Sequence, residues 1–214
     1  MRPLEPPASP VERGWILVET LLATALTLYL AVRLERLSVW LFLPLAFLLI
    51  GWRRPEELGL EPRFRPPGIV THLLIVFVLF AAYAVGHIAV ARLGWGAVFE
   101  PRLPRDLGWL AVHQLLAISL PEETFFRGYV QGRLNRAFGR GRSVFGATVG
   151  VGLWIQAGLF ALCHLATGDW TRLRVFFFAL FAGWLRERTG SIAAPVVYHA
   201  VANVWYAIVF SSLS

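Results

Sequence analysis

The sequence predicts an all-α membrane protein, a polytopic helical bundle of about seven transmembrane helices. Of its 214 residues, 57% are hydrophobic and only 15% are charged, whereas a soluble domain carries about a quarter charged residues. Apolar runs of near-membrane length follow one another along the chain, and arginines gather between them. A soluble core of this size does not need so much apolar sequence, so we expect a bundle embedded in a bilayer.

A helix that crosses the hydrocarbon core needs about 20 apolar residues. The segments that approach this length are, in chain order, 15–32, 37–52, 68–91, 107–134, 144–166, 173–185 and 191–210. The first follows a polar, proline-rich N-terminus and exceeds the apolar region of a cleaved signal peptide, so we expect a signal anchor that is retained. The second and sixth are short.

Tryptophans near the proposed ends support these boundaries. An interfacial aromatic belt predicts such positions, and the residues concerned are Trp15, Trp40, Trp52, Trp95, Trp109 and Trp170. No linker separates the segments, so we expect a single integral-membrane domain over residues 1–214. Residues 1–106 carry no recognisable motif, whereas residues 107–214 carry several.

The charge pattern predicts the topology. All basic residues are arginine, and the net charge is +7. The positive charges lie in the loops, so we interpret them as topology determinants and lipid-headgroup contacts and expect no nucleic-acid partner. The side richer in arginine should be cytoplasmic, which places the N-terminus in the cytoplasm. The arginine-only, alanine- and leucine-rich composition is typical of a GC-rich bacterial genome and indicates the bacterial inner membrane.

The fourth segment contains three charged residues, Glu122, Glu123 and Arg127. Each costs about 2.5–3.5 kcal/mol at the centre of a bilayer, which argues for a purpose or a partner. Glu123 and Arg127 have the spacing and order that favour a helical ion pair. Glu122 points about 100° away and is the candidate general base, because a carboxyl group removed from water has a raised pKa. The alternative is an acidic pair at the membrane edge, neutralised by nearby arginines.

Two further motifs place polar groups on apolar segments. The fifth segment ends in Phe160-Ala-Leu-Cys-His164, and the seventh contains His199-Ala-Val-Ala-Asn203. The spacing of His199 and Asn203 puts both side chains on one helix face. Together with the two glutamates these groups would form a polar site inside the membrane. The sixth segment is only about 20 Å long, so His164 would be drawn inward, toward a site in the cytoplasmic half.

These residues resemble the CAAX protease and bacteriocin-processing (CPBP, or Abi) family of intramembrane glutamic proteases. The family pattern is EExxxR, then FxxxH, then HxxxN or HxxxD, and residues 122–127, 160–164 and 199–203 match it in order. The stretch Arg186-Glu-Arg-Thr-Gly-Ser-Ile192 is similar to the family as well. The resemblance covers residues 122–203.

The resemblance implies an endopeptidase whose catalytic helices lie within residues 107–214. Glu122 and His164 would position and deprotonate a water molecule, and His199 and Asn203 would stabilise the oxyanion. Glu123 and Arg127 would hold the helix geometry. No cofactor or metal is expected, and the partner would be a membrane-embedded or lipid-anchored peptide or protein. Eukaryotic relatives cut prenylated C-terminal tails, and the candidates in a bacterium are a bacteriocin-type peptide, an anchored regulator or a C-terminal sorting tail.

Several alternatives stay open. Two histidines and a glutamate are possible zinc ligands, although the sequence has no HExxH pair and asparagine is a poor zinc ligand. Cys163, the only cysteine, adjoins His164, but neighbouring helical residues diverge, which favours a packing role. A non-catalytic scaffold or bacteriocin-immunity protein is the alternative on the same fold. A proton-coupled transporter using Glu122 would be expected to show internal repeats, and none is visible.

Overall fold

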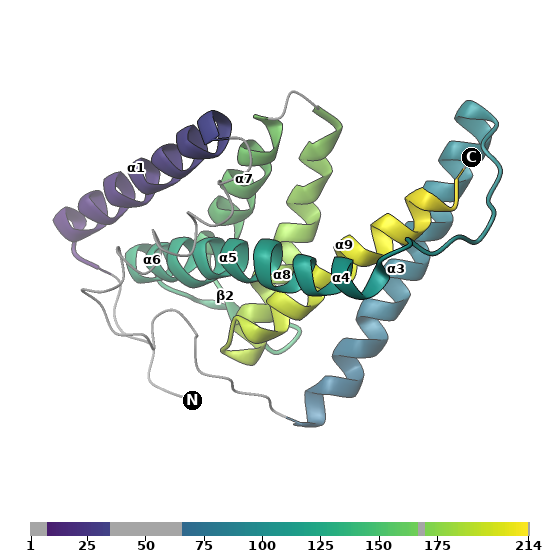
Figure 1. The fold of residues 1–214 in the computed structure, drawn as a ribbon. Coiled ribbons are helices and arrows are strands. Elements are labelled where there is room, and N and C mark those ends of the chain that lie inside the picture. Colours follow the sequence, from purple (N-terminus) through teal and green to yellow (C-terminus); the bar gives the residue numbers. More distant parts are fainter. Residues whose placement is uncertain (1–7, 35–65, 167–169, 214) are drawn as a thin grey trace. The chain divides into compact units, whose positions relative to one another are not determined.

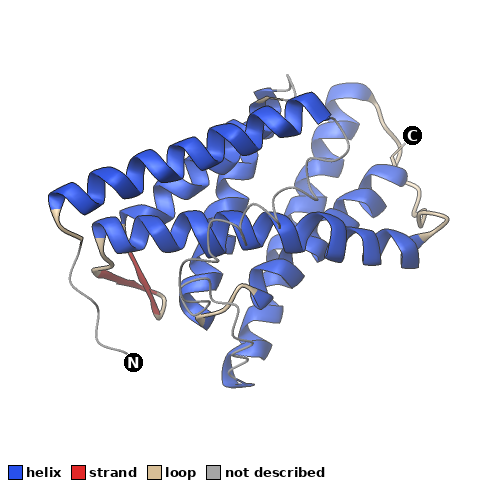
Figure 2. Ribbon diagram, turned by 60° about the vertical axis from the view of Figure 1, so that its left-hand side comes forward, coloured by secondary structure: helices blue, strands red, loops and turns tan. Residues whose placement is uncertain are grey.

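The structure is a computed structural model that describes residues 8–34, 66–166 and 170–213. Over these residues the chain is almost entirely helical, with one short β-hairpin (Figures 1 and 2). In chain order the elements are α1 (Pro10–Leu34), α3 (Pro66–Trp95), α4 (Leu107–His113), the π-helix η2 (Gln114–Ser119), α5 (Leu120–Glu123), the π-helix η3 (Thr124–Val130), α6 (Gln131–Phe138), β1 (Arg142–Val144), β2 (Ala147–Val149), α7 (Val151–Leu165), the 3-10 helix η4 (Trp170–Arg174), α8 (Val175–Thr189) and α9 (Ala193–Ser211).

The chain divides into two compact units, each of which is described by itself. The first contains the described residues of Met1–Arg63 together with Leu120–Pro195. The second contains the described residues of Phe64–Ser119 together with Val196–Ser214.

Among the residues that the structure describes, three helical segments are long and apolar enough to cross a membrane, namely Pro10–Leu30, Phe77–Trp95 and Ala193–Ser211. They correspond to the first, third and seventh segments of the sequence prediction. The helix α7 is apolar but shorter, and the second predicted segment, 37–52, lies outside the described residues. The helical, membrane-type fold is therefore confirmed, and the number of spans stays a prediction.

The fifth predicted segment begins too early. The apolar pattern predicts a helix from Val144, but β1 and β2 pair antiparallel there and the helix begins only at Val151. Gly146 takes the left-handed φ of +77° that a tight turn requires. A Cβ atom at Gly150 would lie 2.2 Å from the carbonyl oxygen of Gly139, so the chain crosses itself closely before α7 begins. Hydropathy does not distinguish such a hairpin from an apolar helix.

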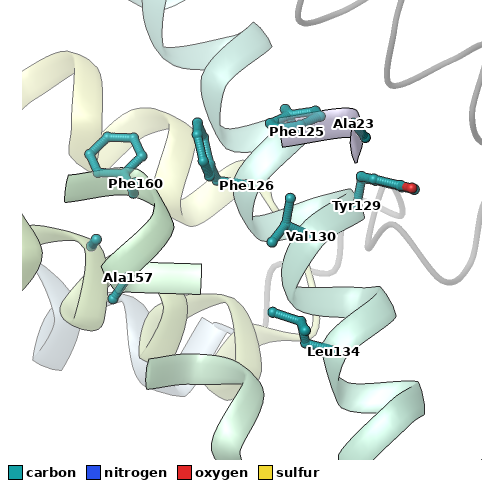
Figure 3. Close-up of a cluster of buried hydrophobic side chains, with 9 residues drawn as sticks. Ala23, Phe125, Phe126, Tyr129, Val130, Leu134, Ala157 and Phe160 are labelled. Atoms are coloured by element: carbon teal, nitrogen blue, oxygen red, sulfur yellow. The ribbon is translucent and has the colours of Figure 1, made fainter. Parts of the chain in front are cut away.

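A buried aromatic cluster forms the core of the first unit (Figure 3). Every side chain of η3 is buried. The rings of Phe126 and Phe160 meet edge to face with centroids 4.9 Å apart, which fixes η3 against α7. The helix α1 joins through Ala23 and through Glu19, whose carboxylate accepts a hydrogen bond from the Tyr129 hydroxyl at 2.8 Å.

The helices α7 and α8 approach each other at Gly183. A Cβ atom at this position would lie 2.5 Å from Cδ1 of Leu153 and 2.6 Å from Nε2 of Gln156. Gln156 donates hydrogen bonds to the carbonyl oxygens of Leu153 and Ala179, at 3.1 and 3.0 Å. Close contact and a shared polar group are how helices associate in a membrane, and here they hold the helix that carries His164.

In the second unit, α9 is held against α3 and against the loop that follows it. The ring of Phe80 stacks on Tyr198 with centroids 5.4 Å apart, and the indole N–H of Trp205 donates to the Phe80 carbonyl oxygen at 3.1 Å. The backbone N–H of Glu100 donates to the carbonyl oxygen of Ser212 at 2.7 Å. These contacts fix the helix that carries His199 and Asn203.

Candidate active site

The helix that carries the two glutamates is widened on both sides of them. The π-helices η2 and η3 flank the four-residue α5, which contains Glu122 and Glu123. Pro121 supplies a local reason, because its ring lacks an N–H and clashes with the carbonyl group four residues earlier. Single π-helical turns occur frequently at functional sites. The distortion therefore marks this part of the helix as the place to look for chemistry.

Glu123 and Arg127 form the ion pair that their spacing predicts. Nη1 of Arg127 donates to Oε1 of Glu123 at 2.9 Å, and both side chains are 0% exposed. The Arg127 guanidinium also lies over the ring of Phe160, 4.4 Å from its centroid. A buried charge needs compensation of this kind. The pair is thus sequestered in the core and joins the glutamate helix to α7.

His164 lies one turn beyond Phe160 on α7 and is oriented by it. The two rings have centroids 4.4 Å apart, and Nδ1 of His164 lies 2.9 Å from the carbonyl oxygen of Phe160. A carbonyl oxygen only accepts, so Nδ1 carries the proton in this contact and Nε2 of the neutral ring is an acceptor. The phenylalanine of the FxxxH motif therefore contacts both the Arg127 guanidinium and the histidine.

Glu122 lies near the same turn of α7. Its carboxylate is close enough to Cys163 to act electrostatically on the thiol. Cys163 adjoins His164 in the sequence, so the first unit brings together Glu122, the buried ion pair and the part of α7 that carries the histidine. In contrast to Glu123, the Glu122 side chain is only partly buried.

His199 and Asn203 belong to the second unit. His199 is 5% exposed, and Asn203 lies one turn further along α9. The Asn203 amide donates a hydrogen bond from Nδ2 to Oε1 of Gln114 at 2.8 Å. Gln114, the first residue of η2, is a residue that the motif reasoning misses. The sequence feature that could have indicated Gln114 is its polar amide side chain inside the apolar run that precedes Glu122.

Comparison with protein-family models gives a match that covers the candidate site residues. Residues 104–205 match the model of the family described as type II CAAX prenyl endopeptidase Rce1-like. This segment, just under half of the chain, is similar to the Rce1-like family. The resemblance inferred from the three motifs is thereby confirmed, and the matched residues include all six candidate side chains as well as Gln114. No curated protein and no solved structure matches the chain.

The Rce1-like segment contains a second polar cluster, centred on Glu187 in the stretch 186–192. Oε1 of Glu187 accepts hydrogen bonds from Gln131, Asn135 and Arg186, each at 2.7 Å. Nε of Arg140 lies 3.1 Å from its other oxygen. Burial opposes ionisation of this carboxyl group, but the two guanidinium groups and the hydrogen bonds outweigh burial, so the pKa of Glu187 lies below its usual range. The cluster ties α6 to α8 and is structural in character.

His113 is exposed beside Trp109, with ring centroids 6.4 Å apart. Among the described residues, no three or more His, Cys, Asp or Glu side chains are grouped closely enough to hold a metal ion.

Proposed function

We propose that the chain is an intramembrane endopeptidase that hydrolyses a peptide bond of a membrane-associated peptide or protein. The observation that carries this proposal is the ordered presence of all three motifs within the Rce1-like segment. The arrangement of the first unit supports it, because the buried pair of Glu123 and Arg127 contacts the phenylalanine that orients His164.

The proposed chemistry is addition of water to the peptide carbonyl group. Glu122 takes a proton from water, and Nε2 of His164 accepts the second hydrogen bond of that molecule, which orients it for attack. The resulting oxyanion is stabilised by His199 and Asn203, which act as donors in a low-dielectric site. The proton held by Glu122 then passes to the leaving amine, so the products are a carboxylic acid and an amine, and Glu122 is again a carboxylate.

The hydrogen bond between Asn203 and Gln114 suits this role. One N–H of the Asn203 amide is engaged by the Gln114 oxygen, which fixes the amide orientation and leaves the second N–H as a donor to the substrate. A donor held in place before the reaction stabilises the transition state without a cost of reorganisation.

The wider setting belongs to the same proposal. We place the chain in the bacterial inner membrane as one integral domain of about seven spans, with its N-terminus in the cytoplasm. The substrate is a bacteriocin-type peptide, an anchored regulator or a C-terminal sorting tail. The family name refers to prenylated tails, a modification that a bacterial substrate would normally lack.

The test uses the full chain in liposomes, supplied with a quenched library of membrane peptides in the presence of a chelator. Mass spectrometry of the products should show internal peptide-bond cleavage that the chelator leaves unchanged. Cleavage that is lost on chelation and restored by zinc would instead establish the zinc-dependent version. If no peptide is cut even when each candidate substrate class is represented, the endopeptidase assignment fails in favour of the non-catalytic alternative.

A further inference from the structure

The β-hairpin between α6 and α7 has an unusual residue at its tip. Phe145 and Gly146 form a two-residue turn with φ values of +45° and +77°. Positive φ at both central positions is typical of a type I′ turn, which favours asparagine or glycine. A bulky aromatic residue in this region is a genuine outlier. The Phe145 side chain is 89% exposed, so packing within the described residues does not explain its presence.

Two arginines accompany this ring. The Arg188 guanidinium lies against the turn, since a Cβ atom at Gly146 would be 1.5 Å from Nη1 of Arg188. Arg142 begins β1 and is exposed. Within the part of the chain that the structure describes, no carboxylate forms an ion pair with either of them, in contrast to Arg140, which pairs with Glu187. The hairpin therefore combines a solvent-exposed aromatic ring and the Arg188 guanidinium at its turn with the exposed Arg142 at the other end of β1.

The depth of the hairpin follows from the length of the helix beside it. The 15 residues of α7 span about 22 Å, which is less than the hydrocarbon thickness of about 30 Å. The apolar run of the sequence continues through residues 144–149, so the hairpin occupies the level where α7 leaves the hydrocarbon. An open sheet edge is not tolerated within the hydrocarbon itself. The hairpin therefore lies in the interfacial layer, which adjoins the end of α7 and still allows water to reach an open sheet edge.

The hairpin is held rigidly at this level. The Trp184 indole N–H donates to the Val144 carbonyl oxygen at 2.9 Å, and Ala147 and Val149 are buried, so β2 packs on α8. Figure 2 shows the two strands in red. The exposed tip is thus presented by a fixed support rather than by a free loop.

We propose that the hairpin 142–149 is a binding site for the headgroup of an anionic phospholipid, with Phe145 inserted at the boundary of headgroups and acyl chains. Guanidinium groups bind phosphate oxygens in a bidentate geometry, and Arg188 supplies one beside the turn while Arg142 supplies one at the start of the same hairpin. Aromatic side chains are preferred at membrane interfaces. The combination of positive charge and an apolar ring matches a lipid surface, where anionic headgroups lie directly above the acyl chains. The inference does not depend on the proposed peptidase activity.

The first test measures depth by spin labelling. Because Cys163 is the only cysteine, a C163A background accepts single cysteines at Phe145, Val144 and Ser143. In anionic liposomes we expect labels at Phe145 and Val144 to lie about 5–10 Å below the phosphates, and the label at Ser143, on the opposite face of the strand, to lie in water. Val144→Cys lies outside the strained turn, so its label still measures the depth of the hairpin if Phe145→Cys does not fold. Equal access of a water-soluble relaxation agent to all three labels would overturn the proposal.

The second test measures retention of anionic lipid by the native turn. Phosphatidylglycerol binding to the full chain in detergent is compared for wild type, Arg142→Gln and Arg188→Gln, with glycerol phosphate as the soluble competitor. Removal of either arginine charge should weaken phosphatidylglycerol binding about fivefold. Glycerol phosphate should compete poorly because it lacks acyl chains. Arg102→Gln is the matched control, since the Arg102 charge is already compensated by Glu100. Equal weakening by the control, or none by either hairpin variant, would show that no specific site exists.

Discussion

Replacement of one partner of the buried ion pair should reveal how strongly the candidate site depends on it. Arg127 and Glu123 are both 0% exposed and are separated by 2.9 Å. Arg127→Met leaves the Glu123 carboxylate buried without its cation, and Glu123→Gln leaves the guanidinium buried without its anion. Removal of one partner of such a pair typically costs about 3–5 kcal/mol, and the loss of the contact with Phe160 adds up to about 2 kcal/mol in the first variant.

The two variants should differ in their dependence on pH. An orphaned carboxylate is relieved by protonation, which for an ordinary glutamate costs about 3.7 kcal/mol at pH 7 and about 1 kcal/mol at pH 5. The stability lost by Arg127→Met should therefore shrink by roughly 2–3 kcal/mol as the pH falls from 7 to 5. An orphaned arginine is not deprotonated in this range, so the loss in Glu123→Gln should stay constant.

The assay is reversible unfolding in mixed micelles at pH 5, 6 and 7, with each variant compared with wild type at the same pH. The double variant Glu123→Gln/Arg127→Met contains no orphaned charge and should be more stable than the sum of the single losses predicts, by about 2–3 kcal/mol. Additive losses, or a pH dependence that is equal in both single variants, would refute the assignment of a buried, ionised pair.

Three further predictions concern packing, positioning and charge. Gly183→Ala should destabilise the chain by about 1–3 kcal/mol in the same unfolding assay, because its Cβ atom would meet Leu153. The control is Gly158→Ala on the same helix pair, which has open space around it and should be neutral or stabilising by up to about 1 kcal/mol. Gln114→Ala should lower kcat for a cleaved peptide about tenfold with little change in KM, since it releases the Asn203 amide, and Gln114→Glu, which keeps the acceptor oxygen, should lose less. The pKa of Glu187 is lowered in the fold. Its ionised form therefore stabilises the fold at pH values above the usual carboxyl range, and this stability is lost as the pH falls. Wild type should accordingly lose thermal stability more steeply than Glu187→Gln below about pH 4.5.

The motifs and the helical spacing carried most of the chemistry that could be predicted from the sequence. The pair of Glu123 and Arg127 followed from an interval of four residues, and the structure contains it. The family followed from three short patterns, and the matched segment includes them. Both predictions depend only on the order and spacing of residues along the chain, which can be read from the sequence.

The misses have a common physical cause. The hairpin at residues 142–149 has the hydropathy of a helix end, and it is determined by Gly146 and by the close approach of Gly150 to Gly139, which hydropathy does not report. Gln114 meets Asn203 across 89 positions, and Phe160 bridges Arg127 and His164 through ring contacts. Such contacts depend on tertiary packing rather than on spacing within one helix.

The central claim is that Glu122 activates water for peptide hydrolysis, and the most direct test is the cleavage rate of Glu122→Gln in liposomes with a chelator present. The matched variant is Cys163→Ala, which removes the only thiol beside His164. We predict that Glu122→Gln loses a factor of about 10²–10⁴ in kcat while Cys163→Ala cleaves at a rate close to that of wild type. Equal cleavage by wild type and Glu122→Gln would contradict the account.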